Sequence, residues 1–306
     1  MKIVVVGGSG FIGSHLVDKL INDNHHVIIY DVDMPRYEQD CEFIRGDARD
    51  LQRLLISTRK IDAIYHLAAE ANVNRFYESP IFSNDITAVS TLNVLECAKV
   101  NEISRVLLAS TEWIYGSGEG NEEQIIDEEA PYSQNPDHIY TSSKICAELF
   151  CKNYFQLYNV NYTIMRYGIP FGERARPATV TPIFMNKIIN NEEILIHGDG
   201  SQTRQFIYVK DLAQGNVACL KKEAENQIFN LNGKQKISVL DIVQTLETIL
   251  SKKAKIKLSE QRKGNFQGRY ISSEKAKSIL GWEAEMNYME AMRKYVSDYN
   301  KNSNKN

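Results

Sequence analysis

A tyrosine and a lysine four residues apart are the side chains of this sequence best suited to acid–base chemistry. In the segment "YTSSK", Tyr140 and Lys144 would lie on one face of a helix, because residues i and i+4 are neighbours on a helix surface. An ammonium group near a phenol favours the phenolate and lowers the tyrosine pKa from about 10. A phenolate at neutral pH can remove the proton of an alcohol as a general base. Without further context, such a pair would more often be two ordinary surface residues.

A glycine-rich turn near the N-terminus predicts a site for a dinucleotide. The segment "VVVGGSGFIGSHL" runs from an apolar strand into a helix and contains Gly7, Gly10, Phe11, Ile12 and Gly13. A tight turn, the close approach of a pyrophosphate to the backbone and the packing of helix on strand all favour glycines at this spacing. The helix N-terminus also attracts an anion. We expect these five residues to contact the dinucleotide, although a turn that holds no ligand is the alternative.

An acid at the end of the second strand favours NAD as the cofactor. Asp31 follows "HHVIIY" and lies 18 residues after Gly13. A carboxylate at this place can accept hydrogen bonds from both ribose hydroxyls, and it would repel the 2′-phosphate of NADP. We therefore expect NAD. Two alternatives stay open: Asp31 could cap a turn, and Arg36, five residues further along, could favour NADP.

The elements that must position these residues alternate between strands and helices. Apolar strands are expected at residues 3–6, 27–30, 63–67, 106–109 and 162–166. Helices are expected near residues 14–22, 51–55, 83–99 and 140–158. The alternation indicates βαβ units, and the uninterrupted apolar strands indicate a parallel sheet buried on both faces. The predicted fold class is α/β: a doubly wound, Rossmann-type parallel sheet with a smaller α/β C-terminal lobe.

The second half of the chain is less regular than the first. It carries the prolines, glycines and arginines expected of a smaller lobe packed on the sheet. We expect an NAD-binding domain over residues 1–166, with a returning segment at about 206–232. A substrate-binding lobe would comprise residues 167–205 and 233–306.

The composition excludes several classes of protein. The chain has 36 basic and 39 acidic residues, a net charge of −3, and no basic stripe, which argues against nucleic acid as a partner. No apolar run approaches the roughly 18 residues of a membrane span. The first strand begins at Ile3, which leaves no room for a signal peptide. Five cysteines without a CxxC pair indicate free thiols rather than disulfides or a metal site. We therefore expect a cytoplasmic protein with no membrane attachment.

Further motifs follow the strands and open the helices in a set order. They are "GDARD", "YHLAA", "STEWIYG", "YTSSK", "GDGSQTRQFIYVKDLA" and "SSEKAKSILGW". Together with the glycine turn, this set resembles the extended short-chain dehydrogenase/reductase family, in particular its NAD-dependent nucleotide-sugar epimerases and dehydratases. The resemblance extends from Lys2 to about Tyr295 and is closest to the UDP-glucose 4-epimerase group. It implies an enzyme that acts on a nucleotide-diphosphate sugar.

The resemblance also implies roles for individual residues. Tyr140 would remove the proton of a sugar hydroxyl, and the hydroxyl of Thr111 would bond the same oxygen. His66 is more simply explained as a residue that packs beside the cofactor site. The residues that match the family's cofactor contacts are Asp47 and Ala48 at the adenine, Leu67, Ala68 and Ala69 along the dinucleotide, Lys144 at the nicotinamide ribose, and Tyr167.

The substrate contacts of the family are only partly present. Arg204 and Arg262 match two arginines that pair with the substrate phosphates, and either could instead be a surface charge. Ile169 stands where the family has an asparagine that bonds the diphosphate. In "RARPATVTP", Arg174 or Arg176 could supply a compensating contact.

The two residues after Thr111 discriminate between chemistries. The family's dehydratases carry Asp-Glu there and the related decarboxylases a glutamate at the second place, whereas this chain has Glu112 and Trp113. An indole cannot transfer protons, so epimerisation or simple oxidation and reduction is favoured over dehydration. Glu112 could still contact the substrate or transfer a proton. Trp113 could shape the substrate pocket or fill the interface between the two parts of the chain.

The leading hypothesis is an NAD-dependent epimerase that inverts C4 of a UDP-hexose through a transient 4-keto sugar. A nucleotide-sugar reductase, dehydrogenase or dehydratase that uses NAD(P) is the alternative, and a non-catalytic dinucleotide sensor on the same fold is a third. The resemblance further implies a homodimer that pairs the helices expected at residues 83–99 and 140–158.

Overall fold

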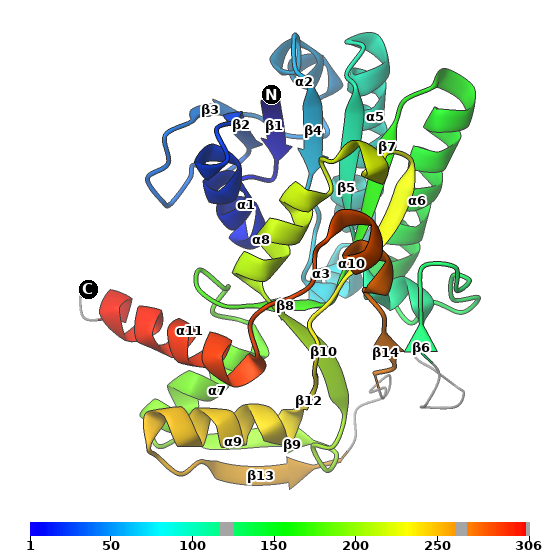
Figure 1. The fold of residues 1–306 in the computed structure, drawn as a ribbon. Helices are drawn as coiled ribbons and strands as arrows, with labels where there is room; N and C mark the ends of the chain where they lie inside the picture. The colour runs from blue at the N-terminus through cyan, green and yellow to red at the C-terminus, as the bar shows by residue number, and fades with distance from the viewer. Residues whose placement is uncertain (117–124, 261–267, 304–306) are drawn as a thin grey trace.

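A seven-stranded parallel sheet forms the centre of the larger of two parts of the molecule (Figure 1). The computed structural model of the chain describes residues 1–116, 125–260 and 268–303. The strands of the sheet are β1 Lys2–Val6, β2 His26–Asp31, β3 Glu42–Arg45, β4 Ala63–His66, β5 Arg105–Thr111, β7 Tyr162–Tyr167 and β11 Gln227–Leu231. Their order is β11-β7-β5-β4-β1-β2-β3, and every pairing is parallel. The order reverses between β1 and β4, where ligands of such sheets bind outside the carboxyl ends of the strands.

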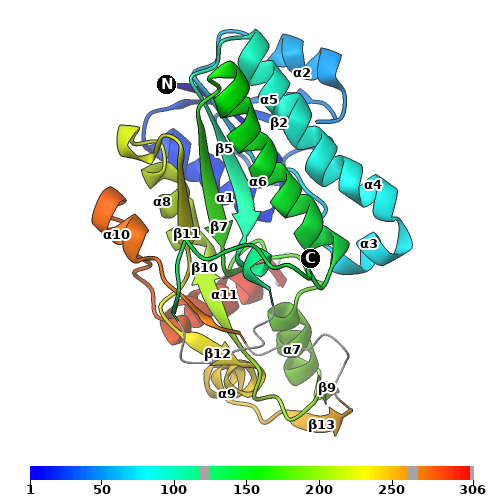
Figure 2. The same cartoon turned by 90° about the vertical axis from the view of Figure 1, so that its right-hand side faces the viewer.

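Helices cover both faces of this sheet (Figure 2). One face carries α2 Leu51–Ser57, α5 Ser90–Val100 and α6 Ile139–Tyr158. The other carries α1 Phe11–Asn22, α8 Val209–Ala218 and α10 Glu274–Leu280. The strands between them bury Ile3, Val4 and Val5 completely, because alternate side chains enter the two apolar cores. The predicted Rossmann-type, doubly wound fold class is confirmed.

The smaller lobe lies at the carboxyl ends of the strands and has an apolar core of its own. Its elements are β8 Ile169–Phe171, α7 Val180–Ile189, β9 Glu193–His197, β10 Thr203–Tyr208, β12 Lys236–Ser238, α9 Val239–Leu250, β13 Lys255–Ser259 and α11 Tyr288–Ser303. Strands β12, β10 and β8 form one small sheet, and β13 pairs with β9 in another. The side chains of Ser238 and Asp241 form a capping box that fixes the start of α9.

The chain passes between the two parts more than once. The expected returning segment supplies α8 and β11 to the larger domain. The C-terminal segment that was expected in the smaller lobe is itself divided. Its α10 packs in the larger core together with Trp282, whose indole N–H donates to the carbonyl oxygen of Asp211 at 3.1 Å. The elements β12 and α9 before it and α11 after it contribute to the core of the lobe, as expected.

The helix predicted at residues 83–99 is interrupted. The structure has α4 Pro80–Asn84, one π-helical turn η1 Asp85–Val89, and then α5. The hydroxyls of Thr87 and Thr91 donate to carbonyl oxygens four residues earlier, at 3.0 Å and 2.8 Å. Such bonds compete with the helix ladder and widen it locally, which the apolar spacing alone does not reveal.

The remaining elements are short. They are α3 Val73–Glu78, the 3₁₀ turns η2 Glu112–Tyr115 and η3 Lys222–Ala224, and the paired strands β6 Ile125–Ile126 and β14 Tyr270–Ile271. Of the helices in the described ranges, none combines the length and the apolar character that a membrane crossing requires.

Candidate active site

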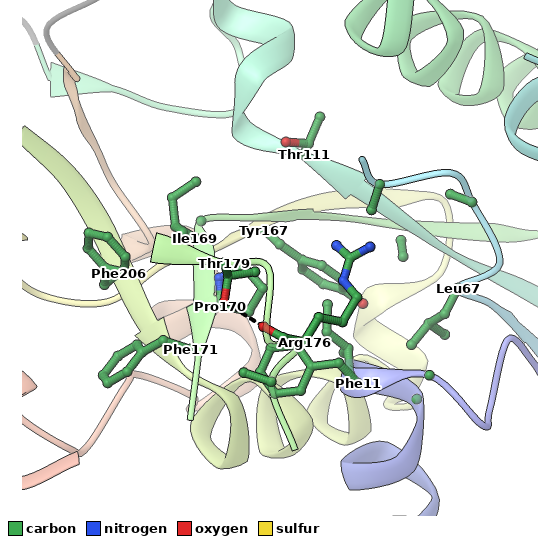
Figure 3. A pocket seen from close by; sticks show the side chains of 18 of the residues that line it. Phe11, Leu67, Thr111, Tyr167, Ile169, Pro170, Phe171, Arg176, Thr179 and Phe206 are labelled. Carbon is green, nitrogen blue, oxygen red and sulfur yellow. Dashed lines mark hydrogen bonds between the residues drawn. The ribbon is translucent and has the colours of Figure 1, made fainter. Parts of the chain in front are cut away.

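A cavity of about 600 Å³ lies between the larger domain and the smaller lobe, at the carboxyl ends of β1, β4 and β5 (Figure 3). Phe11, Leu67 and Thr111 line it from the larger domain. Ile169 and Phe206 line it from strands of the lobe. The cavity therefore brings together the glycine turn, the strand ends and the lobe, as the position of the sheet reversal predicts.

The glycine turn is shaped by backbone contacts that leave no room for side chains. Gly7 has a φ of +87°, and a Cβ atom there would lie 2.6 Å from the backbone nitrogen of Ala68. A Cβ atom on Gly13 would lie 2.2 Å from the carbonyl oxygen of Gly7. Leu67 and Ala69, on either side of Ala68, line the cavity. The turn thus packs directly on the end of β4 and on the start of α1, which only glycine permits.

The first turn of α1 opens on the cavity in the way that a pyrophosphate requires. Gly10 precedes the helix in an extended conformation and provides no side-chain cap. Together with its neighbours Phe11 and Ile12, it lines the cavity. Uncapped N–H groups at a helix start favour an anion. The residues present therefore fit the diphosphate of a dinucleotide.

Asp31 lies beside this turn. Its carboxylate accepts hydrogen bonds from the backbone N–H groups of Ser9 at 3.0 Å and Asp33 at 3.1 Å. Burial raises the pKa of Asp31, and these two bonds oppose the rise. The carboxylate keeps lone pairs that could accept further hydrogen bonds from ribose hydroxyls.

Asp47 and Ala48 lie near the edge of the sheet, after β3. The carboxylate of Asp47 pairs with Arg49 at 2.6 Å, and the hydrogen bonds of this pair lower the pKa of Asp47. The carbonyl oxygen of Ala48 accepts a hydrogen bond from the side chain of Asn93 at 2.9 Å. Neither residue is among those that line the cavity. Their place at the adenine end thus stays a prediction.

Thr111, Tyr140 and Lys144 all line the cavity. Thr111 ends β5, and the other two residues lie one turn apart near the start of α6. The hydroxyl of Thr111 lies near that of Tyr140 and lowers its pKa. The ammonium group of Lys144 donates to the carbonyl oxygen of Ala109 at 2.8 Å. The three side chains therefore converge on one wall of the cavity, next to the glycine turn.

The pKa of Tyr140 differs from the sequence-based prediction. Burial raises it to about 12, and the neighbouring hydroxyl of Thr111 and the charge of Arg176 lower it by a smaller amount. Burial also lowers the pKa of Lys144 to about 8, against the opposing charge of Glu148. The sequence predicts that the ammonium group of Lys144 and the charge of an oxidised nicotinamide together lower the pKa of Tyr140, and the protein surroundings by themselves raise it. The ammonium group is bonded to Ala109, and desolvation of the phenolate outweighs the favourable charges.

His66 packs beneath the site and is only 1% exposed. Its Nε2 atom is hydrogen-bonded with the hydroxyl of Ser90 at 3.1 Å. Burial, helped by the charge of Lys144, lowers its pKa to about 3, so the ring is neutral at physiological pH. This environment agrees with the packing role expected from the sequence.

Glu112 and Arg204 share a second, much smaller cavity of about 20 Å³, with Trp113 on its wall. Burial raises the pKa of Glu112 to about 8, and the charge of Arg204 opposes the rise. One guanidinium nitrogen of Arg204 donates to the carbonyl oxygen of Thr203 at 2.7 Å. Both residues were predicted to contact substrate, and neither lines the main cavity. They lie close enough to interact electrostatically at the interface between domain and lobe.

Trp113 separates the two cavities, because it lines both of them. Its ring meets that of Tyr140 edge-on at 6.0 Å and lies 5.5 Å from that of His138. Both roles left open by the sequence are therefore present: the indole shapes the main cavity and fills the interface. It also holds the ring of Tyr140 in place.

The two candidate arginines of "RARPATVTP" point in different directions. Arg176 lines the cavity, and its side chain extends into it (Figure 3). Arg174 instead forms an ion pair with Asp18 at 2.8 Å. Ile169, which replaces the family's asparagine, contributes an apolar patch to the cavity wall. Arg262, the second predicted phosphate contact, lies outside the described residues.

No sequence motif identified several of the residues that line the cavity. Phe171, Phe206 and Tyr295 come from three separate segments of the lobe. Thr179, which precedes α7, also borders the cavity. A Pro-rich stretch before a helix indicates the start of α7, but nothing local indicates that these aromatic rings face a ligand rather than a core.

Comparisons with known proteins agree with this arrangement. Residues 3–231 match the model of the NAD dependent epimerase/dehydratase family, and the chain belongs to that family. Membership confirms NAD as the expected cofactor. A protein of Methanocaldococcus jannaschii provisionally named UDP-glucose 4-epimerase is 34% identical over 99% of both chains.

Two solved structures are similar over almost their whole length. The UDP-glucose 4-epimerase of Thermotoga maritima, crystallised with UDP-glucose, has a TM-score of 0.92 at 26% identity and covers 99% of this chain and 100% of its own. The UDP-glucuronic acid 4-epimerase of Bacillus cereus, in complex with UDP-glucuronic acid and NAD, has a TM-score of 0.88 at 27% identity, over 98% of this chain and 99% of its own.

Proposed function

We propose that the chain is an NAD-dependent 4-epimerase of a UDP-sugar. The observation that carries the proposal is the convergence of Thr111, Tyr140 and Lys144 on one wall of a cavity that also contains the glycine turn. A reacting alcohol held against Tyr140 would lie next to a bound dinucleotide. The similar proteins that are named as 4-epimerases of UDP-sugars support the same reaction and the same substrate class.

One side chain would transfer the proton and two others would support the transfer. Tyr140 removes the proton of the sugar 4-hydroxyl and later returns it. The hydroxyl of Thr111 bonds the same oxygen and fixes its orientation. Lys144 binds the cofactor ribose and contributes positive charge. When bound, NAD⁺ supplies the acceptor for the hydride that leaves C4 of the sugar, and its positive charge favours the phenolate. Because the 4-keto sugar takes the hydride back, no net oxidation results.

The lining of the lobe suits a sugar that must present both faces. Ile169, Phe171 and Phe206 offer apolar surface rather than fixed hydrogen bonds. A 4-keto sugar can turn against such a surface without breaking strong contacts, while the nucleotide holds it in the cavity.

Arg176 would contact an anionic group of the substrate. It is the residue of "RARPATVTP" that enters the cavity, and its charge acts on Tyr140. Such a contact would compensate for Ile169, which cannot bond the diphosphate. The anionic group is either the diphosphate itself or a carboxylate on the sugar.

Dehydration is the less suitable alternative. Glu112 is turned into the smaller cavity, and the next residue, Trp113, cannot transfer protons. The wall beside Tyr140 therefore offers no second acid or base at the place where the family's dehydratases carry one.

The experiment is to incubate the purified protein, without added cofactor, with UDP-glucose, UDP-N-acetylglucosamine and UDP-glucuronic acid. We expect NMR to show a second anomeric signal from one of them, at constant nicotinamide absorbance. Stoichiometric oxidation or reduction of nicotinamide would instead indicate a dehydrogenase or reductase. A 4-keto-6-deoxy product would indicate a dehydratase.

We also propose a homodimer formed through the helices at residues 83–99 and 140–158, which are the end of α4, η1, α5 and α6 in the structure and lie side by side. Ile81 (78% exposed), Val89 (38%), Leu149 (42%) and Leu157 (69%) present apolar side chains on these helices. Burial of such a surface would stabilise a dimer. Light scattering should give twice the chain mass, and Leu149→Glu should shift it towards the monomer. The matched change Leu258→Glu, on β13, should leave the mass unchanged.

A cytoplasmic location is part of the same proposal. The five cysteines are all unpaired thiols. Free thiols persist in a reducing compartment such as the cytoplasm. Fractionation of cells that express the tagged protein would test the location.

A further inference from the structure

Residues 172–176, called the strap here, are the first part of the connection from β8 to α7. The last residue of the strap, Arg176, lines the cavity. The backbone of the strap is unusual. Gly172 has a φ of +136° and Arg174 a φ of +64°. The left-handed region is unfavourable for a residue with a side chain, so other contacts must hold Arg174 there.

The contacts that hold the strap come from the cofactor side of the molecule. The guanidinium of Arg174 pairs with Asp18 of α1 at 2.8 Å and lies 4.1 Å above the ring of Tyr37. The ring of His15, also on α1, donates from Nε2 to the carbonyl oxygen of Glu173 at 2.8 Å. Burial keeps this histidine neutral by lowering its pKa to about 4.

These anchors belong to the elements that carry the expected dinucleotide contacts. Helix α1 begins at the glycine turn, and Tyr37 follows Asp31 in the segment after β2. The strap is a part of the lobe in sequence, yet Arg174 is fastened to the larger domain. The carboxylate of Glu173 is held from both parts, since it accepts hydrogen bonds from Tyr208 of β10, in the lobe, at 2.8 Å and from Lys210 of α8, in the larger domain, at 2.9 Å.

A turn at residues 176–179 follows these contacts and leads the chain into α7. The backbone oxygen of Arg176 accepts hydrogen bonds from the backbone N–H of Thr179 at 3.2 Å and from its hydroxyl at 3.0 Å. This turn directs the side chain of Arg176 into the cavity (Figure 3). Among the described residues, Arg176 forms no ion pair within the chain that would hold it there. Its direction therefore depends on the backbone of the strap.

We propose that Arg174 is a positioning residue for substrate binding: it fastens the strap to α1 and Tyr37 so that Arg176 faces an anionic group of the nucleotide sugar. The inference rests on the proposed function, because it assumes that the cavity binds such a substrate. Arg174 points away from the cavity and touches no substrate itself. The charge of Arg174 is paired with that of Asp18. Arg174 therefore affects substrate binding only by orienting Arg176.

Arg174→Gly tests this inference with little disturbance of the backbone. Glycine adopts a φ of +64° readily, so the strap keeps its conformation preference while the ion pair and the ring contact are lost. Lys60→Gly is the matched control. Lys60 is an exposed cation with a φ of +58°, far from the strap in sequence, and its replacement relieves the same backbone strain.

The measurement is the Kd of UDP-glucose and of UDP-glucuronic acid, by calorimetry with the NAD-loaded protein. We expect Arg174→Gly and Arg176→Ala each to weaken binding by on the order of tenfold. Lys60→Gly should bind as the unchanged protein does. In the double variant, the loss should not exceed that of Arg176→Ala alone, because both changes remove one interaction. Bound NAD per chain should stay the same in all variants.

The arms of the experiment separate the possible outcomes. An equal loss for both ligands assigns the diphosphate to Arg176, and a loss confined to UDP-glucuronic acid assigns the sugar carboxylate. Unchanged binding in Arg174→Gly, or additive losses in the double variant, would overturn the inference. If Arg174→Gly does not fold, Asp18→Asn removes the same ion pair from the other side and should weaken binding in the same direction. Binding without epimerisation would refute the proposed function alone, and absence of binding by the unchanged protein would refute both.

Discussion

The two sides of the cavity are built by different means. On the side of the larger domain, the part of the wall formed by the glycine turn is backbone: Gly7 and Gly13 lie so close to neighbouring main-chain atoms that a Cβ atom would collide with them. On the side of the lobe the wall consists of side chains from separate segments, such as Phe171, Phe206 and Tyr295. A backbone wall tolerates almost no substitution, whereas a wall of side chains can change one residue at a time. We therefore expect the larger domain to determine which cofactor binds and the lobe to determine which sugar binds.

The largest effect is expected where the two sides meet. Tyr140→Phe keeps the ring that packs against Trp113 but removes the hydroxyl that exchanges the proton. Turnover should fall by about 10³-fold or more, while bound NAD and the Kd of the nucleotide sugar should be preserved. Product formation followed by NMR measures the loss. Tyr270→Phe, at a tyrosine on β14, is the control, and full activity of Tyr140→Phe would refute the role of Tyr140.

A change in the backbone wall should remove the cofactor. In Gly13→Ala the new methyl group meets the carbonyl oxygen of Gly7, so the turn must open. We expect a loss of stability of about 1–3 kcal/mol and little bound NAD in the purified protein. Gly281→Ala is the control. Gly281 has a φ of +66°, so alanine there is strained by its backbone conformation, but no atom lies within 4 Å of the new methyl group. This control should lose some stability and retain NAD, and retention of NAD by Gly13→Ala would contradict the comparison.

The interface between the two sides should respond to pH through Glu112. Burial raises its pKa from 4.5 to about 8 in the folded protein. Between these values the folded state holds a proton that the unfolded state has released, so the free energy of unfolding should fall as the pH rises. The slope from this group is at most about 1.4 kcal/mol per pH unit. Urea unfolding from pH 5 to pH 8 should show a shallower slope for Glu112→Gln than for the control Glu274→Gln. An equal slope in both variants would show that Glu112 ionises normally.

The smallest effect is expected in the wall of side chains. Phe206→Leu keeps an apolar residue of smaller size on β10. Such a change usually costs less than about 1.5 kcal/mol, so we expect KM for the sugar nucleotide to rise by less than about tenfold. Bound NAD should not change. A larger effect on bound NAD than on KM would mean that the two walls do not divide their roles as the structure indicates.

The contrast between the walls also explains how much could be predicted from the sequence. Local spacing in the sequence is enough to predict the geometry of the glycine turn, of the strand ends and of the pair Tyr140 and Lys144. The interrupted helix at η1 was not predicted, because hydroxyl bonds to the backbone do not alter the apolar spacing.

The predictions that failed or stayed open depend on the direction of single side chains. Glu112 turns away from the cavity because the chain enters a 3₁₀ turn directly after Thr111. Arg174 and Arg176 could not be told apart, since a positive φ at an arginine leaves no mark in the sequence. The rise that burial causes in the pKa of Tyr140 was not predicted, because desolvation is a property of the folded surroundings and not of residue spacing.

The connections between domain and lobe have a consequence for how substrate enters. The chain crosses from one part to the other between β7 and β8, between β10 and α8, and between β11 and β12. Several short crossings restrict the relative movement of two parts more than a single flexible connection does, because each crossing must change its conformation at the same time. A nucleotide sugar should therefore gain access by local rearrangement of loops and side chains at the rim, and the distance between the two parts should change little during a catalytic cycle.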